Sequence, residues 1–231
     1  MSERLPKTLI LAQLIYVIKT KFLIIYLTIY GTDMAKIDIA LIQQLRERTG
    51  LGMMDCKKAL EETNGDVDKA VELLRKKGAA VAAKRSDKTT SEGLVHAYIH
   101  PGSQVGVLVE LNCETDFVAR TESVKEFAHG LCMHIAAMKP IYISSADVDP
   151  AFVEKEKEII KEQLAQSGKT GKILDQIVEG KVNKVYTDVC LLEQTYIKDD
   201  KFTVKQVLQD LIAKTGENIK IAKFARYQVG G

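Results

Sequence analysis

The chain has 231 residues, of which 46% are hydrophobic and 28% charged, with a net charge of +2. These values are ordinary for globular proteins, and the length allows one or two domains with a sizeable core. A charge this close to neutral gives no general attraction to nucleic acid or to anionic lipid. Tryptophan is absent and only 6% of residues are aromatic, so we expect an aliphatic core.

The first 33 residues differ from the rest of the chain. Residues 8–30 are strongly apolar and are interrupted by Lys19 and Lys21. Each apolar half is shorter than the roughly 20 residues of a membrane helix, and no small-residue cleavage site follows it. The stretch MAKIDIALIQQL at Met34 is typical of a natural protein start. We therefore interpret residues 1–33 as a mis-assigned, non-native extension, with a targeting segment and a membrane anchor as the alternatives.

Residues 34–85 are predicted to form a module of three short helices. Leu41, Ile42 and Leu45 have helical spacing, and Val67 and Ala70 begin a similar stripe further on. The signals that separate the helices are Gly50, Gly52, the Asn64-Gly65 pair and Asp66. The polar stretch KRSDKTTSEG that follows is typical of a linker.

From Gly93 the hydrophobic period changes from helical to two, which predicts a β-hairpin. Val95, Ala97 and Ile99 alternate with polar positions in the first strand, and residues 105–111 alternate in the second. We expect one face of the hairpin to be buried. His96 and His100 are then expected on the outer, solvated face.

The rest of the chain predicts helices followed by a final strand. The expected helices begin at a capping box of Ser123 and Glu126, at Pro150, near Ile173, and at the cap residue Thr203. The last strand, NIKIAKFARYQV, changes its alternation between Ile221 and Phe224, which indicates a bulge. We predict an α+β fold in which an antiparallel sheet packs with helices. The predicted domains are residues 34–85 and residues 86–231.

No catalytic arrangement is apparent in the sequence. Phosphate-binding, dinucleotide-binding and nucleophile-elbow motifs are absent. The four cysteines, at positions 56, 113, 132 and 190, lack the spacing of a zinc site and are expected to be reduced and mostly buried. An enzyme is disfavoured, and we expect neither a cofactor nor a bound metal.

Two long motifs, RERTGLGMMDCKKALEETNGDVDKA and LNCETDFVAR, resemble those of elongation factor Ts, and the segment GENIKIAKFARYQVG resembles its end. The resemblance covers residues 34–231 and is to the short form of the family. It implies that residues 34–85 are a ubiquitin-associated-like, partner-binding module and that residues 86–231 are a core domain that forms a homodimer.

The resemblance also implies a function. Members of this family bind elongation factor Tu with GDP and promote GDP release by disturbing its Mg²⁺ and phosphate site. It implies no direct contact with nucleic acid or membrane, and a cytoplasmic location, or an organelle if residues 1–33 are a targeting segment. The residues that match the family's Mg²⁺-displacing motif are Thr115, Asp116, Phe117 and Val118, supported by Ala119, Arg120, Arg46, Met53, Met54, Lys57 and Lys58.

Plainer interpretations remain open at this point. Phe117 can be an ordinary core residue at a strand-to-helix turn, since large apolar residues usually serve cores. Asp116 can be a helix cap, Arg120 and the lysines can be solvated, and one methionine can be buried. The whole protein can also be an adaptor that binds other proteins through its first module. An RNA-binding accessory factor has only the basic stretch near Lys84 in its favour.

Overall fold

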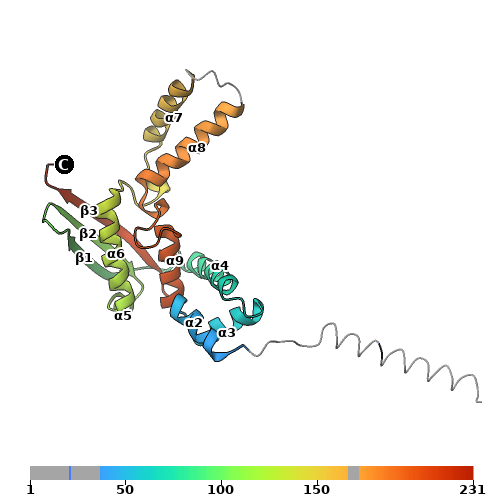
Figure 1. Ribbon diagram of the computed structural model, residues 1–231. Helices are drawn as coiled ribbons and strands as arrows, with labels where there is room; N and C mark the ends of the chain where they lie inside the picture. Colours follow the sequence, from blue (N-terminus) through green and yellow to red (C-terminus); the bar gives the residue numbers. More distant parts are fainter. Residues whose placement is uncertain (1–20, 22–36, 166–171, 231) are drawn as a thin grey trace, which may run out of the picture. The chain divides into compact units, whose positions relative to one another are not determined.

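The computed structural model describes Lys21, residues 37–165 and residues 172–230 (Figure 1). Apart from Lys21, the predictions made for residues 1–33 lie outside the described residues. In the part of the chain that the structure describes, no helix has the length and apolar character to span a bilayer. Two units are distinguished, one formed by residues up to 48 with residues 52–71, the other by residues 49–51 with residues 72–231. The predicted boundary near residue 85 stays a prediction.

The first unit contains α2 (Ile39–Thr49), α3 (Met53–Glu62) and the start of α4 (Val67–Arg85). Left-handed backbone at Gly50, Asn64 and Gly65 allows the chain to turn between these helices. The three predicted helices are thereby confirmed. The side chains that they bury are Ile42, Leu45, Cys56, Ala59, Leu60 and Ala70.

The second unit is built on an antiparallel sheet with the strand order β1 (Glu92–Ile99), β2 (Val105–Cys113), β3 (Ile219–Gln228). The register of β2 and β3 shifts between Glu110 and Leu111, where Ala222 has no partner, so the predicted bulge is confirmed. The sheet and its helices make an α+β fold, as predicted (Figure 1).

Helix α6 (Glu122–Met138) covers one face of the sheet, packing on β1 and β2. It buries Val124, Phe127, Leu131 and Ile135 of the expected apolar stripe, but Met138, the last residue of that stripe, is 46% exposed, so its predicted burial is wrong. Lys139 ends the helix in the left-handed conformation. Its N-cap is Thr121, so the capping box predicted at Ser123 is wrong: the helix begins with Glu122, and Ser123 already lies inside its first turn. Helix α9 (Val204–Thr215) adds Leu208, Leu211 and Ile212 to the same core.

The face of strand β1 that packs against α6 is the opposite of the one predicted to be buried. Val95 and Ile99 are 68% and 64% exposed, whereas the His96 ring lies 3.2 Å from the His129 ring of α6. The expectation that His96 lies on the outer face is therefore wrong. The register explains this, because Tyr98 pairs with buried Val107 and so shares the face that α6 covers.

The remaining helices are the predicted pair α7 (Pro150–Ala165) and α8 (Lys172–Val189). Short 3-10 turns at Ser145–Asp147 and Leu191–Glu193 connect this pair to α6 and α9. Helices α7 and α8 pack on one another around Ile160, Leu164, Val178 and Val182. All four cysteines are buried and free, as predicted. The four-residue helix α5 (Asp116–Ala119) lies between β2 and α6 and carries the candidate site.

Candidate functional site

The candidate site is the segment 114–120, where strand β2 ends and the short helix α5 begins. Two apolar residues anchor this segment: Ala119 is buried in the main core, and Val118 packs against that core. Phe117 points the other way and is 80% exposed. The alternative in which Phe117 belongs to this chain's own core is therefore wrong.

Thr115 fixes the start of α5 through contacts of its backbone and its side chain. Its hydroxyl accepts a hydrogen bond from the Val118 N–H, at 3.5 Å, as an N-cap residue does. The same hydroxyl donates to Glu217 Oε1 at 2.7 Å, and the Thr115 N–H donates to Glu217 Oε2 at 3.0 Å. Both donors of Thr115 therefore end on one carboxylate, 102 residues further along the chain.

Glu114, the residue before, makes the reciprocal contact. Its Oε1 accepts the Asn218 N–H at 2.6 Å, and its carboxylate also pairs with the Arg85 guanidinium at 3.1 Å. The Asn218 N–H, followed by Arg85, lowers the pKa of the Glu114 carboxyl below its usual value. We call Glu114, Glu217 and the groups that they bind (Thr115, Asn218 and Arg85) the carboxylate clamp.

Asp116 and Arg120 flank the exposed ring and pair with one another at 2.7 Å, one helical turn apart. Their side chains are 41% and 77% exposed, so the pair adds little to the stability of the fold. Because water already surrounds both groups, either can exchange its partner for a group on a second protein at small cost. The site thus presents an apolar ring between an acid and a base.

The five residues predicted in the first unit are also at its surface. Met53 and Met54, 56% and 63% exposed, open helix α3 directly after Gly52. Lys57 pairs weakly with Glu61 at 3.7 Å, and Lys58 and Arg46 are exposed. The alternative in which one of the two methionines is a core residue is therefore wrong.

Comparison with known proteins gives the same family as the motifs. The family model described as elongation factor TS matches residues 40–231. The chain is 56% identical over 189 residues to an elongation factor Ts of Caldanaerobacter subterraneus, with 82% of this chain and 94% of the relative covered. It is 54% identical over 195 residues to that of Thermotoga maritima, covering 84% and 97%, and 52% identical over 190 residues to that of Carboxydothermus hydrogenoformans, covering 82% and 88%.

The chain belongs to the elongation factor Ts family. The family match includes every predicted site residue, from Arg46 to Arg120, and the whole carboxylate clamp. It begins after the apolar N-terminal segment.

Sequence reasoning missed the clamp within this elongation factor Ts fold. Glu114 stands inside the quoted motif and Glu217 inside the quoted tail, but no periodicity connects them. The missing signal was the pairing of β2 with β3, because Cys113 opposite Ile219 places Thr115 opposite Glu217. Only the register of the sheet could have brought these residues together.

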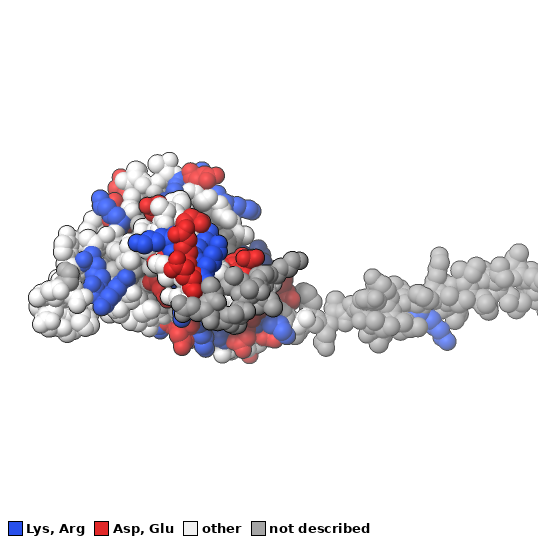
Figure 2. Space-filling view, turned by 90° about the horizontal axis from the view of Figure 1, so that it is seen from above, with Lys and Arg blue, Asp and Glu red and all other residues white. Residues whose placement is uncertain are grey.

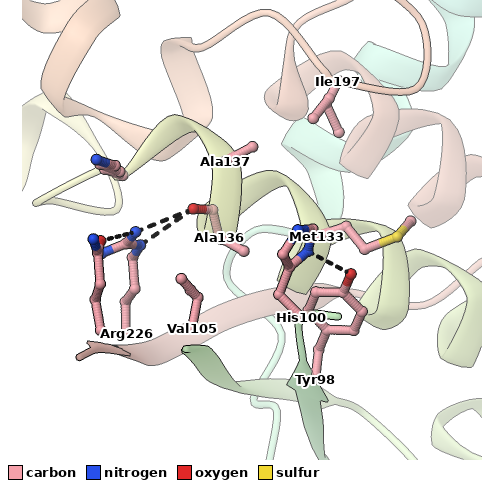
Figure 3. Close-up of a pocket in the computed structure, with 10 residues that line it drawn as sticks. Tyr98, His100, Val105, Met133, Ala136, Ala137, Ile197 and Arg226 are labelled. Atoms are coloured by element: carbon pink, nitrogen blue, oxygen red, sulfur yellow. Dashed lines mark hydrogen bonds between the residues drawn. The ribbon is translucent and has the colours of Figure 1, made fainter. Parts of the chain in front are cut away.

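A cavity of about 390 Å³ lies elsewhere in the same unit, at the end of α6 (Figure 3). Figure 3 shows Arg226 on one side, where it donates to the Ala136 carbonyl at 3.3 Å, and the hydrogen-bonded pair of Tyr98 and His100 on the other. Arg226 thereby satisfies a carbonyl of the last helical turn. None of the predicted site residues lines this cavity.

On one face of the molecule, the distribution of charge does not favour an RNA-binding role for this member of the elongation factor Ts family. On the face shown in Figure 2, the Lys and Arg side chains of the described residues are interspersed with Asp and Glu. An interspersed surface of this kind does not provide the basic stripe on which phosphate binding depends.

Proposed function

We propose that this chain is a guanine nucleotide exchange factor, without catalytic chemistry of its own, that binds elongation factor Tu in its GDP form. It speeds GDP release by disturbing the Mg²⁺ and phosphate site of that partner. The observation that carries the proposal is the exposed ring of Phe117, 80% accessible on a short helix whose neighbouring side chains are anchored. Family membership supports the same conclusion.

An exchange factor works by binding one state of its partner better than another, since only differential affinity shifts an equilibrium. The Phe117 ring therefore has to be buried more completely in the nucleotide-free partner than in the GDP-bound partner. Full burial of such a ring is worth roughly 1.5–3 kcal/mol, which would favour a displaced arrangement of the elements that hold the metal and the phosphate. Thr115 and Val118 hold the turn that presents the ring.

The other residues of the segment have supporting roles in this proposal. Asp116 offers a carboxylate to partner N–H groups or cations, and Arg120 offers a guanidinium to partner acids. Ala119 anchors α5 in the core. In the first unit, Met53 and Met54 supply adaptable apolar contacts, while Arg46, Lys57 and Lys58 supply positive charge. Because that partner works in translation, we infer a cytoplasmic location.

We also propose that two copies of the chain pair through the face of the sheet that α6 leaves open. Val95, Ile99, Leu108 and Tyr227, which are 45–72% exposed, lie on this face and make an apolar surface. The ion pair between Glu110 and Lys223, 3.0 Å apart, borders it. A soluble monomer rarely exposes a contiguous apolar patch without a partner for it.

Light scattering coupled to size-exclusion chromatography tests the pairing. We expect the mass of a dimer for the chain starting at Met34, and the mass of a monomer for Leu108→Lys. Met138→Lys is the matched control, because Met138 is 46% exposed, like Leu108 at 45%, but lies at the end of α6. A monomeric parent chain contradicts the pairing.

Release of fluorescently labelled GDP from elongation factor Tu tests the exchange function. We expect release to accelerate with the concentration of this chain and to reach a plateau. If release is unchanged although the two proteins bind, the adaptor function through Met53 and Met54 is the better description. If the two proteins do not bind at all, the exchange function is wrong and the adaptor function, with another protein as its partner, remains.

A further inference from the structure

We infer that Glu217 is a positioning residue for nucleotide exchange: its carboxylate holds both donors of Thr115 and so fixes helix α5 and the Phe117 ring against the end of the sheet. This inference rests on the proposed role of Phe117. Glu217 belongs to the loop between α9 and β3 and is far from the motif in sequence. It touches no residue that we assign to the partner-binding surface except Thr115.

The clamp continues the β2–β3 ladder beyond its last backbone pair. That pair is Cys113 opposite Ile219. One step further, the Asn218 N–H is accepted by the Glu114 carboxylate at 2.6 Å. Two steps further, the Thr115 N–H is accepted by the Glu217 carboxylate at 3.0 Å. Side-chain oxygens thus replace the carbonyls that a longer strand would supply, and they attach the site to the end of the sheet.

A carboxylate suits this position because Thr115 presents two donors, its N–H and its hydroxyl. The two oxygens of Glu217 accept one each, at 3.0 and 2.7 Å. Hydrogen bonds to an ionised acceptor are about twice as strong as neutral ones. An amide of the same size has only one acceptor oxygen and would turn an NH₂ group toward the second donor.

The clamp is braced from the other side as well. The Asn218 side chain is buried and donates to the carbonyls of Ser86 and Lys88, at 3.3 and 2.9 Å. Arg85, at the end of α4, pairs with Glu114. The residues that hold α5 are therefore themselves held by the turn that follows α4.

The Phe117 ring can displace elements of the partner only if helix α5, which carries the ring, is rigid. Helix α5 has four residues, too few to be stable without tertiary support, and the exposed Phe117 ring provides none. If the helix gave way, the ring could be buried in the partner without moving it. A preorganised helix instead transfers the free energy of burial to the partner.

Glu217→Gln is the decisive variant, because it keeps size and shape and removes one acceptor. We expect the maximal rate of labelled GDP release to fall about tenfold, as for the loss of one charge-assisted hydrogen bond. The half-saturating concentration should change by less than about twofold, since the other contacts remain. Glu158→Gln, an exposed acid on α7, is the matched control for the change in charge, and should behave as the parent chain.

Combining Glu217→Gln with Phe117→Ala separates positioning from a general structural role. If Glu217 acts only through the ring, the double variant should be no slower than Phe117→Ala alone. An additional tenfold loss in the double variant would show that Glu217 acts elsewhere, and the inference would be wrong.

A measurement without the partner keeps this inference distinct from the proposed function. The chain has no tryptophan, so Phe117→Trp introduces a single indole at the tip of the site. Time-resolved anisotropy should show little nanosecond motion of that indole, and clearly more after Glu217→Gln is added. If the motion changes but the parent chain does not stimulate GDP release, the proposed function is wrong and the clamp stands. If neither motion nor rate changes, the clamp has no positioning role.

Circular dichroism checks that Glu217→Gln is folded. If its melting temperature falls sharply, Glu217→Asp replaces it, because Asp keeps both acceptor oxygens on a shorter side chain. We then expect the rate with Glu217→Asp to lie between those of the parent chain and Glu217→Gln. Equal losses in the Asp and Gln variants would contradict the requirement for two acceptors.

Discussion

Phe117→Ala is the change that most directly tests the proposed exchange mechanism. The ring is already 80% exposed, so its removal takes only about one fifth of its burial energy from this chain's own fold. One fifth of roughly 1.5–3 kcal/mol is about 0.3–0.6 kcal/mol. For a protein of this size, such a loss lowers the melting temperature by no more than about 2 °C.

The other four fifths of the ring's burial energy can be gained only when the ring is buried in the partner. Burying them would contribute about 1.2–2.4 kcal/mol to the nucleotide-free complex, which is roughly a sevenfold to fiftyfold change in an equilibrium constant. We therefore expect Phe117→Ala to slow the stimulated release of GDP by about that factor. The assay is stopped-flow fluorescence of labelled GDP leaving elongation factor Tu.

Phe127→Ala is the matched control, because Phe127 is the same residue type at 6% exposure in the core. Its loss should cost about 3–5 kcal/mol of stability and lower the melting temperature by roughly 6–20 °C. Two results would refute the reasoning: normal GDP release with Phe117→Ala, or a fall in its melting temperature as large as that of Phe127→Ala.

Three further predictions concern other parts of the molecule. Burial lowers the pKa of His134 below its usual value, so the unfolded chain takes up this proton at a higher pH than the folded chain. The stability contributed by neutral His134 should be complete above about pH 6.5 and decline as the pH falls toward the folded-state pKa, which denaturation at a series of pH values will show. Replacing Met53 and Met54 together by Ala should raise the half-saturating concentration for GDP release several-fold with little change in melting temperature, since both are exposed; a large loss of stability would be inconsistent with their surface position. Burial raises the pKa of the Cys113 thiol to about 11 and that of Cys132 to about 12, so a thiol reagent at pH 8 should label neither in the folded protein and both in guanidinium, as counted by mass spectrometry.

Local signals in the sequence were sufficient for most of the elements. Thr203 caps α9 as predicted, Gly216 ends that helix and Lys139 ends α6. These features depend on a few neighbouring residues, whose conformational preferences act in any context. Phe117 was located by its motif, and its exposure could then be tested against the alternative of a core position.

Features that depend on pairing between distant residues could not be predicted. In β1, the aliphatic residues Val95 and Ile99 looked like the buried set, yet they lie on the open face while the polar His96 and Tyr98 rings lie under α6. Hydrophobicity alone cannot assign the two faces when both carry apolar groups. The clamp was missed for a similar reason, because Glu217 acquires its role only from the register of β2 and β3.

The unpaired residue Ala222 determines which side chains of the final strand face the core beyond the bulge. Before it, Ile219 and Ile221 face the core, and beyond it the inward positions are Phe224 and Arg226. If Ala222 were paired in a regular ladder instead of being bulged, the strand's outer half would be inverted, with the Tyr227 phenol under α6 and the Arg226 guanidinium on the opposite side. Deleting Ala222 would instead leave a regular strand with the present inward and outward alternation. Among natural variants, we therefore expect loss of the one bulged residue to be tolerated, whereas a single-residue insertion or deletion in β2, where every residue from Val105 to Cys113 is paired, should be eliminated.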